Sequence, residues 1–226
     1  MELILYYTLP ILGTIIVLLA QYSISHNYKK YSKIKSNKNI TGSEAARMIL
    51  DENNLSNIYV VETDGELTDH YDPSRKVIKL SKNIYNGSSI AAVSVAAHEV
   101  GHAIQDKDGY SFMRIRSFLV PIVNFTTYLG YFGLAISIFA GITGYIKISI
   151  IILLASLLFQ LVTLPVEFNA SSRAKKQLYN LGIVTEGENS GVKNMLFAAA
   201  MTYVASFISN ILQILRLVIL LGDRDD

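Results

Sequence analysis

Long apolar runs divide this chain into segments of membrane length and polar segments. Leu3 to Ile24 carries no charged residue, and Phe118 to Gly141 and Ile148 to Val166 repeat that pattern. Each run is long enough to cross a hydrocarbon layer about 30 Å thick as a helix. A fourth run, Met195 to Leu221, contains polar residues and either spans the membrane or lies along its interface. The pattern predicts a mainly α membrane protein with three to four transmembrane helices.

Two helices are expected in the polar segment between the first two runs. Thr41 and Glu44 have the spacing of a capping box, which begins a short amphipathic helix. Gly87 to Ser89 is a plausible second helix start, and Asp106 to Gly109 a plausible stop. The alanine-rich stretch between them predicts a helix of about five turns.

Three short strands are expected between these helices. Ile58 to Val61, Leu67 to Tyr71 and Val77 to Leu80 have the composition of strands, with turn residues at Asp64-Gly65 and at Asp72 to Arg75. We therefore expect a small antiparallel sheet, whose edge strand at residues 77–80 could pair with an extended substrate.

The placement of basic residues predicts the orientation in the membrane. Of 20 Lys and Arg, the segment from Ser25 to Ser117 holds 13 and Glu167 to Asn194 holds 4. The positive-inside rule puts both segments in the cytoplasm, and the turn at Gly144 outside. The basic stretch from Lys29 to Lys38 fits contact with anionic lipid headgroups better than nucleic acid, so no nucleic-acid partner is expected. The absence of cysteine excludes disulfides and thiolate ligands.

The run His98-Glu99-Val100-Gly101-His102 is an HExxH motif on the predicted five-turn helix. Residues four apart share one face of a helix, so both imidazoles can bind one metal ion. Glu99 lies beside them and can act as general base on a water molecule. The competing interpretation is a pair of core histidines with a solvated Glu99, which would leave buried imidazoles without a cation.

A catalytic zinc site needs a third protein ligand, and Glu167 is the favoured candidate. It follows Pro165 where the third run ends, and Glu167 to Arg173 has the pattern of a helix start. A carboxylate at a helix N-terminus is also favoured for structural reasons alone.

His70 and Asp72 are the competing candidates for the third ligand. His70 is also a candidate catalytic residue, because a histidine near zinc can donate a hydrogen bond to the oxyanion formed during hydrolysis. As a solvent-facing strand residue it would need no function.

Several blocks of the chain resemble one known family. They are Leu67-Thr68-Asp69-His70-Tyr71-Asp72-Pro73, Lys79-Leu80-Ser81, Ser89-Ile90-Ala91-Ala92, the residues from Ala96 to Gln105, and Leu164-Pro165-Val166-Glu167-Phe168. These are similar to the YugP-type membrane zinc metallopeptidases, also called neutral zinc metallopeptidase family 2. In outline they also resemble the gluzincin pattern of HtpX-like membrane proteases. The resemblance extends from the first apolar run to about Arg216.

The resemblance implies a zinc site made by His98, His102 and Glu167, with Glu99 as the base. Asn169 and Ser171 depart from it, since the YugP pattern has Asp at the first position and HtpX-like proteins have Asp at the second. Both departures concern the residues around the ligands and leave the ligands unchanged.

The expected function is zinc-dependent peptide hydrolysis at the cytoplasmic face of the cell membrane, on membrane proteins or peptides near the bilayer. A zinc-binding scaffold without turnover is the alternative, and an intramembrane site-2-type protease fits less well because the Asp-Gly pairs lie in polar turns. The expected organisation is a transmembrane anchor (1–24), a cytoplasmic zincin-like α+β metallopeptidase core (25–117), a transmembrane hairpin (118–166), a cytoplasmic helix with the third ligand (167–194), and a fourth transmembrane or interfacial helix with an acidic tail (195–226).

Overall fold

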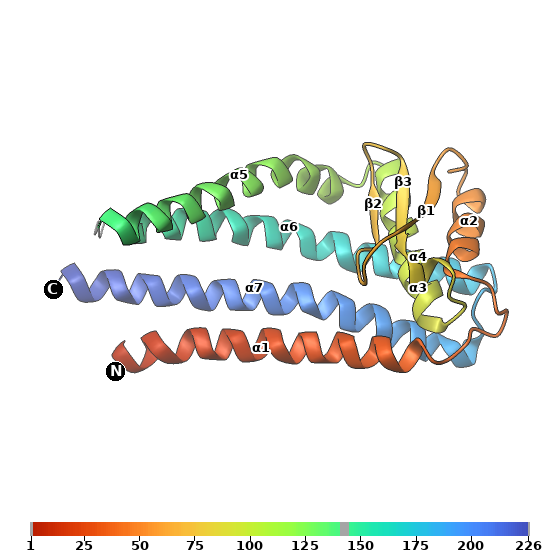
Figure 1. Ribbon diagram of the computed structural model, residues 1–226, viewed down its shortest axis with the longest axis horizontal. Coiled ribbons are helices and arrows are strands. Elements are labelled where there is room, and N and C mark those ends of the chain that lie inside the picture. The colour runs from red at the N-terminus through yellow and green to blue at the C-terminus, as the bar shows by residue number, and fades with distance from the viewer. Residues whose placement is uncertain (1, 141–144, 226) are drawn as a thin grey trace. The chain divides into compact units, whose positions relative to one another are not determined.

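The computed structural model describes residues 2–140 and 145–225, which form long helices and one small sheet (Figure 1). The elements in chain order are α1 (Glu2–Tyr31), α2 (Gly42–Glu52), β1 (Tyr59–Thr63), β2 (His70–Asp72), β3 (Val77–Ser81), α3 (Lys82–Tyr85), α4 (Ile90–Lys107), α5 (Ser111–Ala140), α6 (Tyr145–Asn180), the 3-10 helix η1 (Glu186–Glu188) and α7 (Asn189–Asp225).

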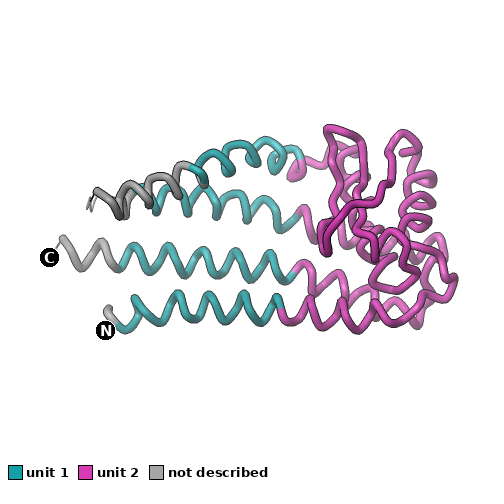
Figure 2. Tube along the Cα trace, viewed as in Figure 1, with its two compact units in different colours: residues 1–21, 114–165, 201–226 teal, residues 22–113, 166–200 magenta. Residues whose placement is uncertain are grey.

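The chain divides into two compact units (Figure 2). Unit 1 comprises Met1–Gln21, Arg114–Pro165 and Met201–Asp226, and unit 2 comprises Tyr22–Met113 and Val166–Ala200. Unit 2 contains the sheet, the helices α2 to α4 and every residue singled out above as a ligand or catalytic group.

Within the described residues, three helices are long and apolar enough to cross a membrane. They are Ile4–Tyr31, Ile148–Asn180 and Glu186–Ile219. These coincide with the first, third and fourth apolar runs, which supports the prediction of a membrane protein. The second run forms most of α5, but its last residue, Gly141, and the predicted turn at Gly144 lie outside the described residues.

In unit 1, two polar residues of α7, Asn210 and Arg216, form hydrogen bonds with neighbouring helices. The Asn210 amide donates to Gln160 Oε1 at 3.1 Å, and Arg216 donates to the Tyr6 hydroxyl at 2.8 Å. The Arg216 guanidinium also lies 4.3 Å from the centre of the Tyr6 ring. Hydrogen bonds between helices are expected for such groups in an apolar unit, because lipid offers them no partners.

In unit 2, local capping signals begin the helices where the sequence predicts. Thr41 and Glu44 form the capping box of α2, with hydrogen bonds of 3.2 and 2.7 Å. The Ser89 side chain accepts the backbone N–H of Ala92 and caps α4. Helix α4 is 18 residues long, so the predicted five-turn helix is confirmed.

Helix α4 is the centre of the hydrophobic core of unit 2. Its small side chains at Ala91, Ala92, Ala96 and Ala97 are fully buried. Helix α2 and the sheet pack against it (Figure 1). Small residues allow these elements to approach closely, so that α4 is covered along nearly its whole length.

The sheet differs from the antiparallel sheet that the sequence predicts. Its order is β1-β3-β2, with β1 parallel to β3 and β2 antiparallel to β3. Residues 77–80 therefore belong to the central strand, and their prediction as an edge strand was wrong. The reason is that the connection from β1 to β2 passes the end of β3, where the Asp69 carboxylate accepts the backbone N–H of Ser81 at 2.7 Å. The inward side chains of β3, Ile78 and Leu80, are fully buried.

The prediction that a helix starts at Glu167 was also wrong. Glu167 does not begin a helix, because α6 runs without interruption from Tyr145 to Asn180 and has Pro165 inside it. Proline fixes a φ compatible with the helix and removes one backbone donor, a loss that apolar membrane helices tolerate. Glu167 is thus held by the interior of a long helix rather than by a helix terminus.

Candidate metal centre

Helix α4 presents His98 and His102 on one face. Their ring centres are 4.8 Å apart and their planes are inclined by 83°. Both side chains are largely buried, with exposed fractions of 15% and 8%. This arrangement follows directly from the four-residue spacing of the motif.

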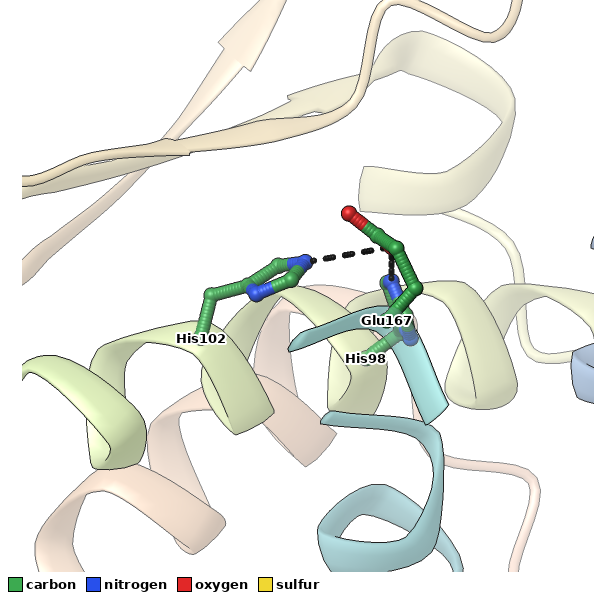
Figure 3. Close-up of side chains that lie close together, drawn as sticks. All are labelled: His98, His102 and Glu167. Carbon is green, nitrogen blue, oxygen red and sulfur yellow. Dashed lines mark hydrogen bonds and ion pairs between the residues drawn. The ribbon is translucent and has the colours of Figure 1, made fainter. Parts of the chain in front are cut away.

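Helix α6 brings a carboxylate to the two imidazoles (Figure 3). Glu167 Oε2 lies 3.2 Å from His98 Nε2 and 3.6 Å from His102 Nε2. The Glu167 side chain is 2% exposed. One ligand atom from each of the three residues lies within 4.8 Å of the others. Glu167 is therefore adjacent to both histidines, as the sequence predicts for a third ligand.

The distances fit a tetrahedral zinc ion. Zinc–nitrogen and zinc–oxygen bonds are about 2.0–2.2 Å long, so two ligand atoms on a tetrahedral zinc are roughly 3.3 Å apart. The two nitrogen–oxygen distances at Glu167, 3.2 and 3.6 Å, bracket that value. Two imidazoles and one carboxylate are also a donor set that catalytic zinc uses.

A close contact between α4 and α6 makes this geometry possible. A Cβ on Gly101 would lie 2.6 Å from the Ala170 carbonyl oxygen and 3.2 Å from the Ala170 Cα. Ala170 itself is fully buried. Only glycine lets the α6 backbone approach so closely, and Ala170 follows Glu167 by one helical turn. Gly101 was not singled out from the sequence, because its importance depends on a helix far away in the chain.

The outer nitrogens of both ligand candidates have neutral partners. His98 Nδ1 lies 3.3 Å from the Ser171 hydroxyl, and His102 Nδ1 lies 3.0 Å from Gln105 Oε1. Asn169 accepts a hydrogen bond from Gln105 at 3.0 Å. The two positions that depart from the related sequence patterns, Asn169 and Ser171, thus lie in the layer of contacts around the ligands.

Glu99, which directly follows His98 on α4, is buried. Burial raises the pKa of its carboxyl to about 7. The nearby carboxylates of Glu167 and Asp69 act in the same direction. The charge of His98 and a hydrogen bond with the backbone of Tyr71 act in the opposite direction. A carboxyl group with a pKa near neutrality is suited to exchanging protons with a substrate or water.

The structure does not bring His70 into this group. His70 is an exposed residue of β2, and its Nδ1 lies 2.7 Å from the carbonyl oxygen of Thr68. It pairs with Lys79 in the sheet, whereas its neighbour Tyr71 pairs with the buried Ile78. His70 is therefore on the face opposite to the buried one, and its catalytic role stays a prediction.

The competing candidate Asp72 makes contacts within its own turn. Its carboxylate accepts the backbone N–H groups of Ser74 and Arg75 at 3.0 and 3.1 Å. The hydrogen bond with Arg75 lowers the pKa of Asp72, although partial desolvation opposes it. These contacts stabilise the turn before β3 and explain the residue without a metal.

These features together define a candidate zinc site in a chain whose described residues include three helices long and apolar enough to cross a membrane. The chain belongs to the family described as "Putative neutral zinc metallopeptidase", whose model matches residues 6–222. It is similar to the Bacillus subtilis (strain 168) protein described as "Putative membrane protease YugP", with 44% identity over 208 residues that cover 92% of each chain. No solved structure matches the chain. The resemblance to this family is confirmed, and with it zinc as the metal that the His and Glu cluster fits.

Replacing Gly101 tests the helix contact. Gly101→Ala should destabilise the protein by about 1–3 kcal/mol, because the added methyl group meets backbone rather than a flexible side chain. It should also weaken zinc binding by about tenfold or more, although no ligand changes, since Glu167 moves away with α6. Thermal unfolding and zinc affinity of the purified protein in detergent measure both effects.

Gly187→Ala is the matched control, because nothing lies within 4 Å of a Cβ added there. It should leave the midpoint of unfolding and the zinc affinity near the wild-type values. Wild-type zinc affinity in Gly101→Ala would contradict the importance of the close contact.

Removing the carboxylate tests the predicted third ligand. Glu167→Ala should lower zinc affinity by more than about a hundredfold, because loss of an outer contact to a ligand alone costs about 10- to 100-fold. Asp72→Ala and Glu186→Ala should keep zinc content near wild type. Full zinc occupancy in Glu167→Ala, with loss of zinc in His70→Ala or Asp72→Ala, would assign the third ligand to a different residue.

Proposed function

We propose that this protein is a zinc-dependent protease that hydrolyses peptide bonds at the cytoplasmic face of the membrane. The observation that carries the proposal is the buried Glu99 beside the cluster of His98, His102 and Glu167. A site that only held zinc for structure would not need a second buried carboxyl group, whose burial is unfavourable.

Three side chains hold the metal in this proposal. His98 and His102 supply their Nε2 atoms, and Glu167 supplies one carboxylate oxygen. When bound, zinc polarises the scissile carbonyl group and lowers the pKa of water toward neutrality. The hydrogen bonds to Ser171 and Gln105 hold the two rings with their Nε2 atoms toward Glu167.

Glu99 moves the proton. Its carboxylate takes a proton from the attacking water and later delivers it to the nitrogen of the leaving amine. The raised pKa of Glu99 favours this second step, since the protonated form then exists near neutral pH. Beside a bound divalent cation, Glu99 would be ionised more readily and so able to accept the proton in the first step.

Strand β2 is the proposed position for an extended substrate. It lies at one edge of the sheet and pairs with β3 on its other side. The backbone of its central residue, Tyr71, hydrogen-bonds to Glu99, so this edge runs beside the proposed base. A peptide that adds to β2 as a further strand would present its carbonyl groups to the site.

The cytoplasmic assignment rests on charge. The polar segments 25–117 and 167–194 hold 17 of the 20 Lys and Arg, and the positive-inside rule places such segments in the cytoplasm. Substrates are then membrane proteins or peptides close to the bilayer, because the ligand Glu167 directly follows an apolar run of α6.

Replacing the base tests the reaction. Glu99→Gln should keep zinc and fold but lower hydrolysis of a fluorogenic peptide by at least about a hundredfold, because an amide cannot accept the proton from water. Zinc content and thermal unfolding of the same preparation show whether the site is otherwise intact. Undiminished hydrolysis by a zinc-loaded Glu99→Gln variant would contradict the proposal.

A wild-type protein that binds zinc but cleaves none of a broad peptide library or of co-purified membrane proteins would instead favour the zinc-binding scaffold. That result would leave the predicted ligands in place and remove the assigned role of Glu99.

Single cysteines test the orientation, since the natural chain has none. Cysteines at Asn37 and Ser190, both exposed positions, should resist a membrane-impermeant thiol reagent in intact cells, whereas one at Gly144 should react. All three should react after the cells are permeabilised. Labelling of position 37 or 190 in intact cells would place the proposed active site on the opposite side.

A further inference from the structure

One buried amide connects the two helices that carry the metal ligands. Gln105 lies on α4 one turn beyond His102 and is fully buried. Its Oε1 is 3.0 Å from His102 Nδ1, and its Nε2 is 2.8 Å from the Val166 carbonyl oxygen and 3.0 Å from Asn169 Oδ1. Both amide hydrogens and the amide oxygen are therefore engaged.

The directions of these hydrogen bonds are fixed by groups that cannot exchange roles. The Val166 carbonyl can only accept, so the nitrogen of the Gln105 amide must face it. Arg173 Nε can only donate, and it donates to Asn169 Oδ1 at 2.8 Å, so the oxygen of Asn169 faces inward. The Gln105 oxygen must then point to His102.

This orientation determines which nitrogen of His102 carries hydrogen. Because Gln105 Oε1 can only accept, His102 must donate to it from Nδ1. Its Nε2, which lies 3.6 Å from Glu167 Oε2, is then the nitrogen whose lone pair can bind a metal.

The same amide also holds the turn of α6 that carries Glu167. Its two acceptors on α6, Val166 and Asn169, lie on either side of Glu167 in the sequence. Arg173, which donates to Asn169, also forms an ion pair with Asp108 just beyond the end of α4. A displacement of α6 along or around its axis that moved Glu167 away from the imidazoles would also break these bonds.

We propose that Gln105 is the positioning residue of the metal centre. Through one amide it keeps His102 in the form with hydrogen on Nδ1 and fixes Glu167 at the distance that a shared zinc ion requires. The inference rests on the proposed metal-binding role of His102 and Glu167. It adds a residue that touches no substrate and acts through both ligands.

Gln105→Met tests this role, because methionine has a side chain of similar length that cannot form the hydrogen bonds of an amide. The expected result is a zinc dissociation constant about 10- to 100-fold higher than that of the wild type, measured by competition with a chromophoric chelator on the full-length protein in detergent. Gln177→Met is the matched control. It makes the same substitution on α6, where Gln177 pairs with Asn53 away from the ligands.

A second measurement separates positioning from general stability. In zinc-loaded protein labelled with ¹⁵N-histidine, the Nδ1 hydrogen of His102 should exchange slowly with solvent in the wild type and in Gln177→Met. In Gln105→Met it should exchange rapidly, because its acceptor is gone. A general loss of stability would instead lower the midpoint of unfolding and leave this hydrogen protected in the folded, zinc-loaded protein.

The outcomes distinguish this inference from the proposed function. A wild-type protein that binds no zinc contradicts the metal site itself. A wild-type protein that binds zinc, with equal affinity in Gln105→Met or with the Nδ1 hydrogen still protected, overturns the role of Gln105 alone. If Gln105→Met does not fold, Asn169→Ala carries the test, since it removes one acceptor of the amide. Its zinc affinity must fall, and an unchanged affinity overturns the inference.

Discussion

The site depends on the contact of the buried Glu167 carboxylate with the imidazoles of His98 and His102, one half-buried and one buried, at 3.2 and 3.6 Å. A second buried carboxyl group, Glu99, lies close enough for its pKa to be raised by the first. Two carboxyl groups close together in a largely buried site are unfavourable without a cation. A divalent cation between Glu167 and the histidines offsets this cost. The burial that favours a cation beside Glu167 also raises the pKa of Glu99.

Small residues provide the space for this arrangement. The alanines of α4 allow its neighbours to cover it, and Gly101 allows the backbone of α6 to approach at Ala170. The middle of the HExxH run thus has a packing role besides the catalytic role proposed for Glu99. A larger residue at Gly101 would change none of the ligand residues. It would still increase the distance between them, because α4 and α6 would have to move apart.

The features that could be predicted from the sequence depend on interactions between residues close together in the chain. The HExxH spacing, the capping box of Thr41 and Glu44, and the cap at Ser89 each depend on contacts three or four positions apart. The strand order did not follow, since it depends on pairing between segments distant in the chain, such as β1 with β3. The continuous helix through Pro165 and the hydrogen bonds between Gln105 and α6 likewise depend on segments distant in the chain. The spacing of Gln105 from His102 does indicate a contact, because a residue one turn beyond a ligand lies on the same face of the helix.

The unbroken α6 has a consequence for where the proposed reaction takes place. Glu167 directly follows the apolar run in the same helix, so no flexible loop separates the carboxylate from residues that favour lipid. A rise of 1.5 Å per residue keeps this ligand within a few ångströms of the end of the apolar run. Under the proposed function, a peptide bond would reach this site only close to the membrane surface. In the proposed function, the helix that supplies the ligand would therefore also select substrates by their distance from the bilayer.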